Sequence, residues 1–235
     1  MNRLTTVLFL CLVLVLPSLA AVSLEKGVTL GDWLNQDEEY YVQTTRYTKA
    51  DFEDIKMLGC DHIRIPVNFD VFYTSMNDEL PPVYFDVLDK AAAWAADLDL
   101  KLVITNAEEL LDDAGFEAAQ ERIVNNWKQM VQHFSGMTDH IAFEVVSGTN
   151  AALSGANLAT VAEATLTGIR EVSSDATVIV GPANFYSVDS LAAVTVFDDA
   201  NVIYAIQMFD PLLFTHQGGT RDEIDYNTEG VPFPY

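Results

Sequence analysis

Two kinds of apolar pattern alternate along the chain. Val- and Ile-rich runs are typical of strands buried on both faces, and apolar residues spaced three or four apart are typical of amphipathic helices. The predicted strands are 27–33, 62–67, 100–107, 140–146, 177–182 and 201–209. The predicted helices are 49–59, 84–100, 116–134 and 156–172, with a shorter one over 187–194. This alternation predicts a parallel sheet covered by helices.

Local signals mark the ends of the first predicted helix. Thr48 is a plausible N-cap because an acid, Asp51, stands three residues after it, and Gly59 is suited to ending the same helix. The chain contains no internal linker or low-complexity tract, so we expect one domain.

The order of the elements favours a barrel over a nucleotide-binding sheet. The first strand region, GVTLGDW, lacks the GxGxxG turn that holds a pyrophosphate. Six consecutive strand-helix units therefore predict an α/β fold of the (β/α)8 TIM-barrel type. At 235 residues the chain is short for a complete barrel of roughly 250 residues, and only about six of the eight units are expected.

The N-terminus has the pattern of a secretory signal peptide. Residues 7–16 form an unbroken apolar run, and small residues follow as far as Ala21. The run is shorter than the about 20 residues that cross a bilayer. We therefore predict a signal peptide over 1–21, a mature domain over 22–235, and a secreted, extracellular or periplasmic protein. Cys60 is then the one cysteine left, and we interpret it as a small buried residue.

The strong negative charge excludes some partners. The formal net charge is −23, which would repel nucleic acid and anionic membranes. The four histidines show no metal-ligand spacing with one another or with Cys60, so neither a metal nor another cofactor is expected.

At the predicted strand ends the chain resembles glycoside hydrolase family 5, the (β/α)8 cellulase and β-glucanase family. The stretches that carry the resemblance are GVTLGDWLN, YTKADFEDIKMLGCDHIRIPVNFD, FEVVSGTN, TVIVGPANFYS and DPLLFTHQGG. The resemblance implies an ancestor that cleaved β-linked glucans or mannans with retention. It also implies two catalytic glutamates, an acid/base on strand four and a nucleophile on strand seven.

This chain departs from the family pattern at the catalytic positions. Ser147-Gly148-Thr149 stands where the family has Asn-Glu-Pro, and the strand that carries the nucleophile lies beyond the residues of this sequence. Glu144 is no replacement, because four residues along a strand place it about 13 Å deeper, at roughly 3.3 Å per residue. We interpret it as a buried structural acid. Retaining hydrolysis needs two carboxyl groups about 5–5.5 Å apart, so we predict no catalytic residue.

Several side chains at the strand ends remain candidates for binding sugar. By resemblance, Arg64 matches an arginine that positions the nucleophile, and the family's His-x-Tyr falls on Gln207-Met208-Phe209. Trp33 is the first choice for stacking on the apolar face of a pyranose ring, although such aromatic residues also cap barrel cores. The predicted substrate-binding residues are Trp33, Arg64, Asn106, Asn184, Gln207 and Phe209.

Three functions stay open from these patterns. The first is a non-catalytic protein that binds β-glucan or a related polysaccharide, or that acts in assembly. The second is a residual or fragmentary endo-β-glucanase. The third is a structural or interaction protein, because six strands leave two unpaired sheet edges, at 27–33 and 201–209, through which a homo-oligomer could form.

Overall fold

The computed structural model describes residues 21–36, 43–69, 79–107, 116–146, 156–221, 224–225 and 229–232. The strands of its main sheet are β1 (Gly27–Thr29), β2 (His62–Val67), β3 (Lys101–Asn106), β4 (Ile141–Glu144), β5 (Thr177–Val180) and β6 (Val202–Tyr204). The helices are α1 (Lys49–Met57), α2 (Pro82–Asp97), α3 (Phe116–His133), α4 (Ala156–Val172), α5 (Ala183–Tyr186), the 3₁₀ helix η4 (Val188–Ala193) and α6 (Leu212–Thr215). A short antiparallel pair, β7 (Thr220–Arg221) and β8 (Ile224–Asp225), follows.

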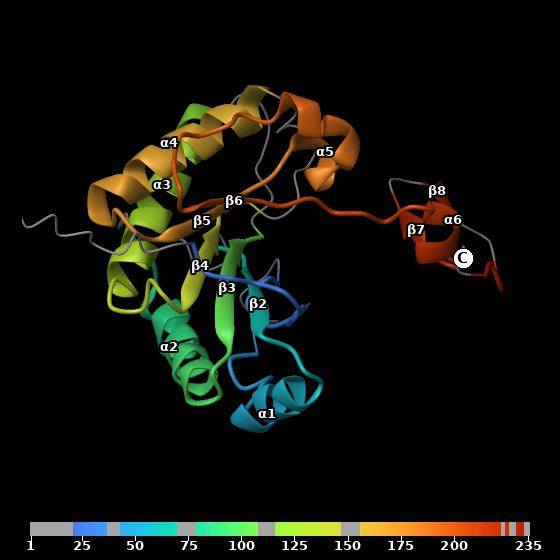
Figure 1. Cartoon of the computed structure of the whole chain (residues 1–235), viewed down its shortest axis with the longest axis horizontal. Helices are drawn as coiled ribbons and strands as arrows, with labels where there is room; N and C mark the ends of the chain where they lie inside the picture. The colour runs from blue at the N-terminus through green and yellow to red at the C-terminus, as the bar shows by residue number, and fades with distance from the viewer. Residues whose placement is uncertain are drawn as a thin grey trace, which may run out of the picture.

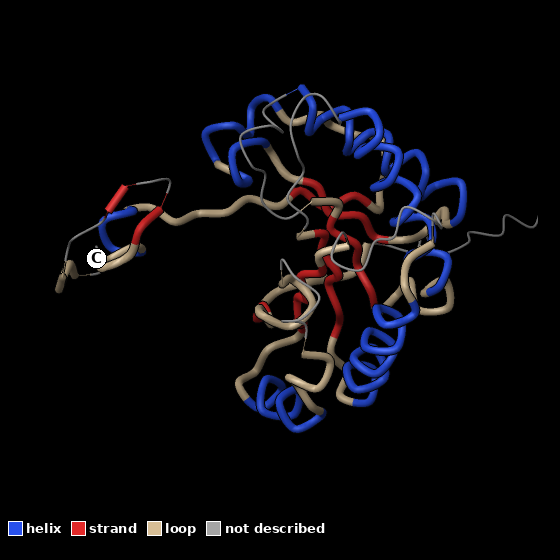
Figure 2. Tube along the Cα trace, turned by 180° about the vertical axis from the view of Figure 1, so that it is seen from behind, coloured by secondary structure: helices blue, strands red, loops and turns tan. Residues whose placement is uncertain are grey.

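The six strands form one parallel sheet in the order of the chain, from β1 to β6. Helices α1 to α4 lie outside the strands, and the strands occupy the centre (Figures 1 and 2). Within the described part of the chain the sheet does not close, so β1 and β6 are its edges. The fold is thus an open arc of the (β/α)8 type, as the sequence predicts.

The two faces of the sheet bury different residues. Alternate side chains of the strands face the helices and form the main core, among them Ile63, Ile104 and Phe143. Residues of the opposite parity, Val103 and Ala142 with Ile179, form a second apolar cluster on the other face. Both faces are therefore apolar along the middle of the sheet, which explains the nearly continuous apolar strand sequences.

The N-terminal strap, residues 21–26, covers part of the second face. The backbone N–H of Val22 donates to Thr177 Oγ1 at 2.9 Å, and Leu24 packs against the second cluster. The N–H groups of Glu25 and Lys26 donate to the Asp61 carboxylate at 2.8 and 3.0 Å. The strap thus joins the beginnings of β5 and β2, and Figure 1 shows it in blue across the strands.

The predicted ends of α1 are confirmed. Thr48 is the N-cap residue, and its backbone N–H donates to Asp51 Oδ2 at 2.7 Å. Gly59 follows the helix with φ at +75°, a conformation that glycine adopts without a Cβ clash.

The two edge strands are shorter than predicted. The stretch 27–33 is strand only to Thr29, and Asp32 then takes a left-handed conformation with φ at 55°, which no strand continues through. The stretch 201–209 is strand only from Val202 to Tyr204, because its neighbour β5 ends at Val180. Beyond it, Gln207 pairs with Ser187 in an isolated bridge.

The chain after Gln207 forms the C-terminal arm, whose described residues are 208–221, 224–225 and 229–232. Both views show α6, β7 and β8 standing apart from the body (Figures 1 and 2). Apolar side chains are exposed along this region and at the β6 edge: Ile206 is 46% exposed, Met208 73% and Leu213 54%. At the opposite edge, Val28 is partly buried against the main core.

Candidate functional site

An ion pair between a half-buried arginine and a buried glutamate lies on the second face of the sheet. Arg64 of β2 donates from Nε to Glu144 Oε2 at 2.6 Å and from Nη2 to Glu144 Oε1 at 3.1 Å. The Glu144 side chain on β4 is 5% exposed. Arg64 Nη2 also lies 3.4 Å from Thr105 Oγ1 on the intervening strand. The interpretation of Glu144 as a buried structural acid is confirmed, and Arg64 is its partner.

Aromatic donors hold the end of β4, where the chain leaves the sheet. Trp127 Nε1 donates to the carbonyl oxygen of Val145 at 3.0 Å, and the Tyr186 hydroxyl donates to that of Val146. These two carbonyls lie beyond the paired part of the strand, so side chains supply donors that a neighbouring strand does not. Trp127 is fully buried, and nothing in the sequence pattern reveals its hydrogen bond.

Tyr186 fits this position through an unusual backbone and a glycine. Its φ is 58°, which is rare for a residue other than glycine. A Cβ at Gly181 would lie 2.5 Å from the Tyr186 ring, so the ring needs glycine there. Burial, together with the nearby Glu144 carboxylate, raises the pKa of the Tyr186 hydroxyl well above its ordinary value. The hydroxyl therefore stays protonated and remains a donor.

Trp33, the first choice for stacking, lies in the core. It is 1% exposed, and its ring packs edge-on against Tyr47 with the ring centroids 5.2 Å apart. Neither face of this ring is open to a sugar, which corrects the expected role. The aromatic residue instead caps the core at the end of β1, because the left-handed turn at Asp32 redirects the chain after that strand.

The other predicted binding residues differ from one another in how far they are exposed. Asn106 ends β3 and is fully buried, with 0% exposure. Gln207 is half-buried, and its N–H donates to the carbonyl oxygen of Tyr186 at 2.8 Å. Phe209 is 42% exposed and lies edge-on to His216. Asn184 lies on α5, and its side chain is outside the description.

Ser147, Gly148 and Thr149, which replace the family's catalytic motif, also lie outside the described residues. The strand that leads to them is described as far as Val146. Its last two carbonyls are the ones that Trp127 and Tyr186 hold. The described residues thus include the strand end that precedes the motif in the chain.

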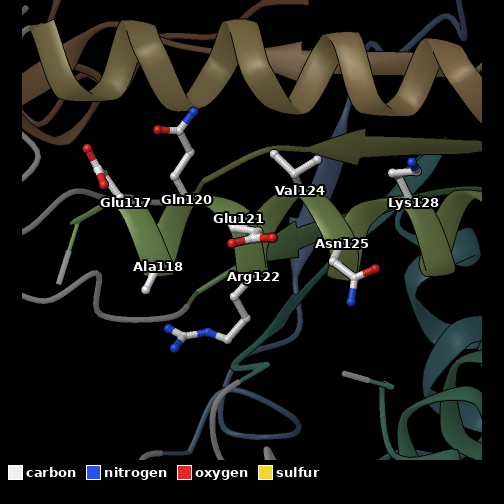
Figure 3. Close-up of a pocket in the computed structure, with 8 residues that line it drawn as sticks. All are labelled: Glu117, Ala118, Gln120, Glu121, Arg122, Val124, Asn125 and Lys128. Atoms are coloured by element: carbon white, nitrogen blue, oxygen red, sulfur yellow. The ribbon is translucent and has the colours of Figure 1, made fainter. Parts of the chain in front are cut away.

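A surface hollow lies elsewhere, along α3 (Figure 3). Its volume is about 760 Å³, and its described lining residues all belong to that helix, with Gln120 and Arg122 pointing to opposite sides. A smaller apolar cavity of about 230 Å³ lies between α4, the end of β5 and η4. Neither cavity is lined by Arg64, Asn106, Gln207 or Phe209.

Among the described residues, no three His, Cys, Asp or Glu side chains come together in a way that could hold a metal ion. None of the described helices is long and apolar enough to span a membrane.

A family model for Cellulase (glycosyl hydrolase family 5) matches residues 23–231, nearly the whole described chain. The chain belongs to glycosyl hydrolase family 5. This family 5 chain is 28% identical over 235 residues to Endoglucanase 3 of Fibrobacter succinogenes, and 26% identical over 208 residues to Endoglucanase C of Acetivibrio thermocellus. These matches cover 90% and 83% of the chain, but only 35% and 60% of the two relatives.

Solved structures agree with the family assignment. The subunit Z of the clostridial cellulose synthase (CcsZ) from Clostridioides difficile matches with a TM-score of 0.74 at 26% identity, covering 83% of this chain and 65% of that one. Cel5A of Thermotoga maritima, crystallised as a mutant with cellobiose, matches with a TM-score of 0.77 at 24% identity, covering 85% and 70%. The latter likeness concerns the fold alone.

Proposed function

We propose that this family 5 chain is a secreted protein that binds β-glucan without hydrolysing it. The observation that carries the proposal is the substitution Ser147-Gly148-Thr149 at the strand-four motif, since glycine can neither donate a proton nor attack. Glu144 is the nearest acid of the same strand, and its carboxylate is already held by both nitrogens of the Arg64 fork. It is therefore not a free acid/base.

The class of ligand follows from the relatives. The two relatives from Fibrobacter succinogenes and Acetivibrio thermocellus are named endoglucanases, and the Thermotoga maritima enzyme has been crystallised with cellobiose and with mannotriose. We assign β-1,4-linked glucan as the ligand of this chain. Phe209 replaces Trp33 as the stacking residue, because it is exposed and stacking needs an accessible ring face. Asn184 and Gln207 remain the proposed polar contributors, whereas Asn106 is fully buried and Arg64 is held by Glu144, so neither is kept as a direct contact.

Calorimetric titration with a soluble cello-oligosaccharide tests the binding. Phe209→Ala is expected to weaken the affinity by about 2- to 10-fold, because stacking of this kind contributes roughly 0.5–1.5 kcal/mol. Leu213→Ala is the matched control, since Leu213 is also an exposed apolar residue of the arm. Equal affinities of wild type and both variants would remove Phe209 from the site. A wild type that binds no oligosaccharide would refute the proposal.

A reducing-end assay on cellulosic and mixed-linkage glucan tests the absence of turnover. We expect no product above the buffer blank, both for the wild type and for Gly148→Glu, because one carboxylate cannot supply both the attack and the proton transfer. The endoglucanase names of the relatives favour hydrolysis as the second candidate function. Reducing ends that follow the wild-type protein through purification would establish it.

A further inference from the structure

The backbone nitrogen of Val22 is a buried amide with a defined partner. Val22 is 6% exposed, and its N–H donates to Thr177 Oγ1 at 2.9 Å, while Thr177 itself is 1% exposed. Two residues further on, Leu24 packs on the apolar cluster of the second face. From Val22 onward, the strap is thus packed against the second face of the sheet.

The surroundings of the Val22 nitrogen suit a neutral backbone amide and not the charged amine of a chain terminus. A terminal amine has an ordinary pKa of about 7.7–8.0 and is charged at neutral pH. An ammonium group at Val22 would lose most of its hydration, and the hydroxyl of Thr177 carries no compensating charge. If Ala21 is retained, the nitrogen of Val22 stays an amide and the charge moves to Ala21, which is only half-buried.

The residues before the strap agree with this boundary. Leader peptidases favour small residues one and three positions before the cut. A cut before Ala21 places Ala20 and Ser18 at these positions, whereas a cut before Val22 places the larger Leu19 at the farther one.

We infer that the leader is removed between Ala20 and Ala21, so that the mature chain begins at Ala21. This is one residue earlier than the small-residue run alone suggested. The inference rests on the secretion included in the proposed function. It adds that the new terminus lies beside the beginning of β5, at the opposite end of the strands from the candidate glycan site.

N-terminal sequencing and intact mass of the full chain, exported from a bacterial host with its own leader, test the cut. Ala21 as the first residue is the expected result. A first residue of Val22 or later would overturn the inference while leaving secretion intact. Retention of Met1 to Ala20 would overturn both.

A stability measurement tests the physical reason independently of export. Two proteins are made without the leader, beginning at Ala21 or at Val22, and melted at pH 6 and at pH 9. Burial lowers the pKa of an amine, so the Val22 form should be destabilised below about pH 8 and recover above it. We expect its melting temperature to be lower by about 5 °C at pH 6, with a smaller difference at pH 9.

Thr177→Val in the Ala21 form is the matched control. It removes the acceptor of the Val22 N–H without introducing a charge, so its loss of stability should be the same at both pH values. Identical melting temperatures of the Ala21 and Val22 forms at pH 6 would contradict the inference.

Discussion

Arg64 and Glu144 are held together by two hydrogen bonds on a face of the sheet where most neighbours are apolar. The attraction between buried charges is offset in large part by the hydration that both have lost. The pair therefore adds little net stability, but each member depends on the other. Removal of Arg64 leaves the buried Glu144 carboxylate without its guanidinium partner.

Arg64→Leu should lower the free energy of unfolding by about 3–5 kcal/mol at pH 7, because the Glu144 carboxylate loses its guanidinium partner. The double variant Arg64→Leu/Glu144→Leu should regain most of that loss, since no uncompensated charge remains. Urea denaturation of the three proteins measures the difference. A double variant that is less stable than the single one would show that the pair itself stabilises the fold.

A second ion pair, between Arg170 and Asp199, makes the stability of the fold depend on pH in the acid range. Asp199 accepts from Arg170 Nε at 2.7 Å and from the N–H of Asn201 at 2.9 Å. The hydrogen bond to Arg170 lowers the pKa of Asp199 below its ordinary 3.8, against the effect of burial. A lowered folded-state pKa means that this stabilisation is complete above about pH 3.8 and is lost as pH falls through the folded value.

Asp199→Asn should therefore cost about 1–3 kcal/mol near pH 6, and this difference from the wild type should shrink below pH 3.8. Urea denaturation as a function of pH gives the comparison. Asp198→Asn is the control, because that neighbouring side chain is exposed. A difference for Asp199→Asn that stays constant down to the lowest pH would contradict this assignment.

At the scale of elements, the end of β4 depends on one helix that precedes it in the chain, α3, and on one that follows it, α5. Trp127 reaches it from α3 and Tyr186 from α5, and each donates to one carbonyl of the strand end. Gly181 makes room for the Tyr186 ring. The carbonyl groups of Val145 and Val146 are thus held by side chains of two helices, while the N–H of Val145 donates to Ile179 of the neighbouring strand.

Gly181→Ala should destabilise the protein by about 1–3 kcal/mol, because the new methyl group overlaps the buried Tyr186 ring. Gly136→Ala is the matched control, since a Cβ there meets nothing within 4 Å and should change stability by less than about 0.5 kcal/mol. Thermal denaturation of both variants measures the contrast. Equal stability of the two would show that Tyr186 moves aside without cost.

The sequence predicted the central elements well, and for a clear reason. β2 (62–67) and α4 (156–172) have the predicted bounds. A strand buried on both faces gives a continuous apolar run, and a helix buried along one face gives apolar residues three or four positions apart. The edge strands were overestimated, because the left-handed turn at Asp32 interrupts the run after β1 and the apolar run of β6 continues after β5 has ended. Trp33 was misplaced because an apolar pattern does not distinguish a ring that caps the core from one that faces solvent.

At the scale of the whole molecule, two features have opposite effects on association between copies of the chain. The exposed apolar surface at the open sheet favours association, and the negative charge opposes it. The β6 edge and the C-terminal arm expose Ile206, Met208 and Leu213, while the net charge of −23 opposes contact between copies. Repulsion between surface charges is screened beyond about 8 Å at physiological salt, whereas edge pairing and apolar contact act at shorter range.

We therefore expect light scattering to detect a dimer or a larger assembly at moderate ionic strength, and the assembled fraction should increase with added salt. Ile206→Lys should reduce assembly, because it places a charged residue beside the exposed β6 edge. Its control is Val196→Lys, at a residue that is 80% exposed and not in a described strand. A monomer throughout the salt range would refute an assembly role.

The hydrogen bond between Trp127 and Val145 also makes the chain its own spectroscopic probe. The emission of an indole responds to the polarity around its N–H, and here that N–H is bonded to the carbonyl two residues before Ser147. Of the three tryptophans, Trp33 packs against Tyr47 and Trp94 packs against Phe52. Fluorescence of a Trp33→Phe/Trp94→Phe protein would thus follow ligand-induced change at the strand-four end without any added label.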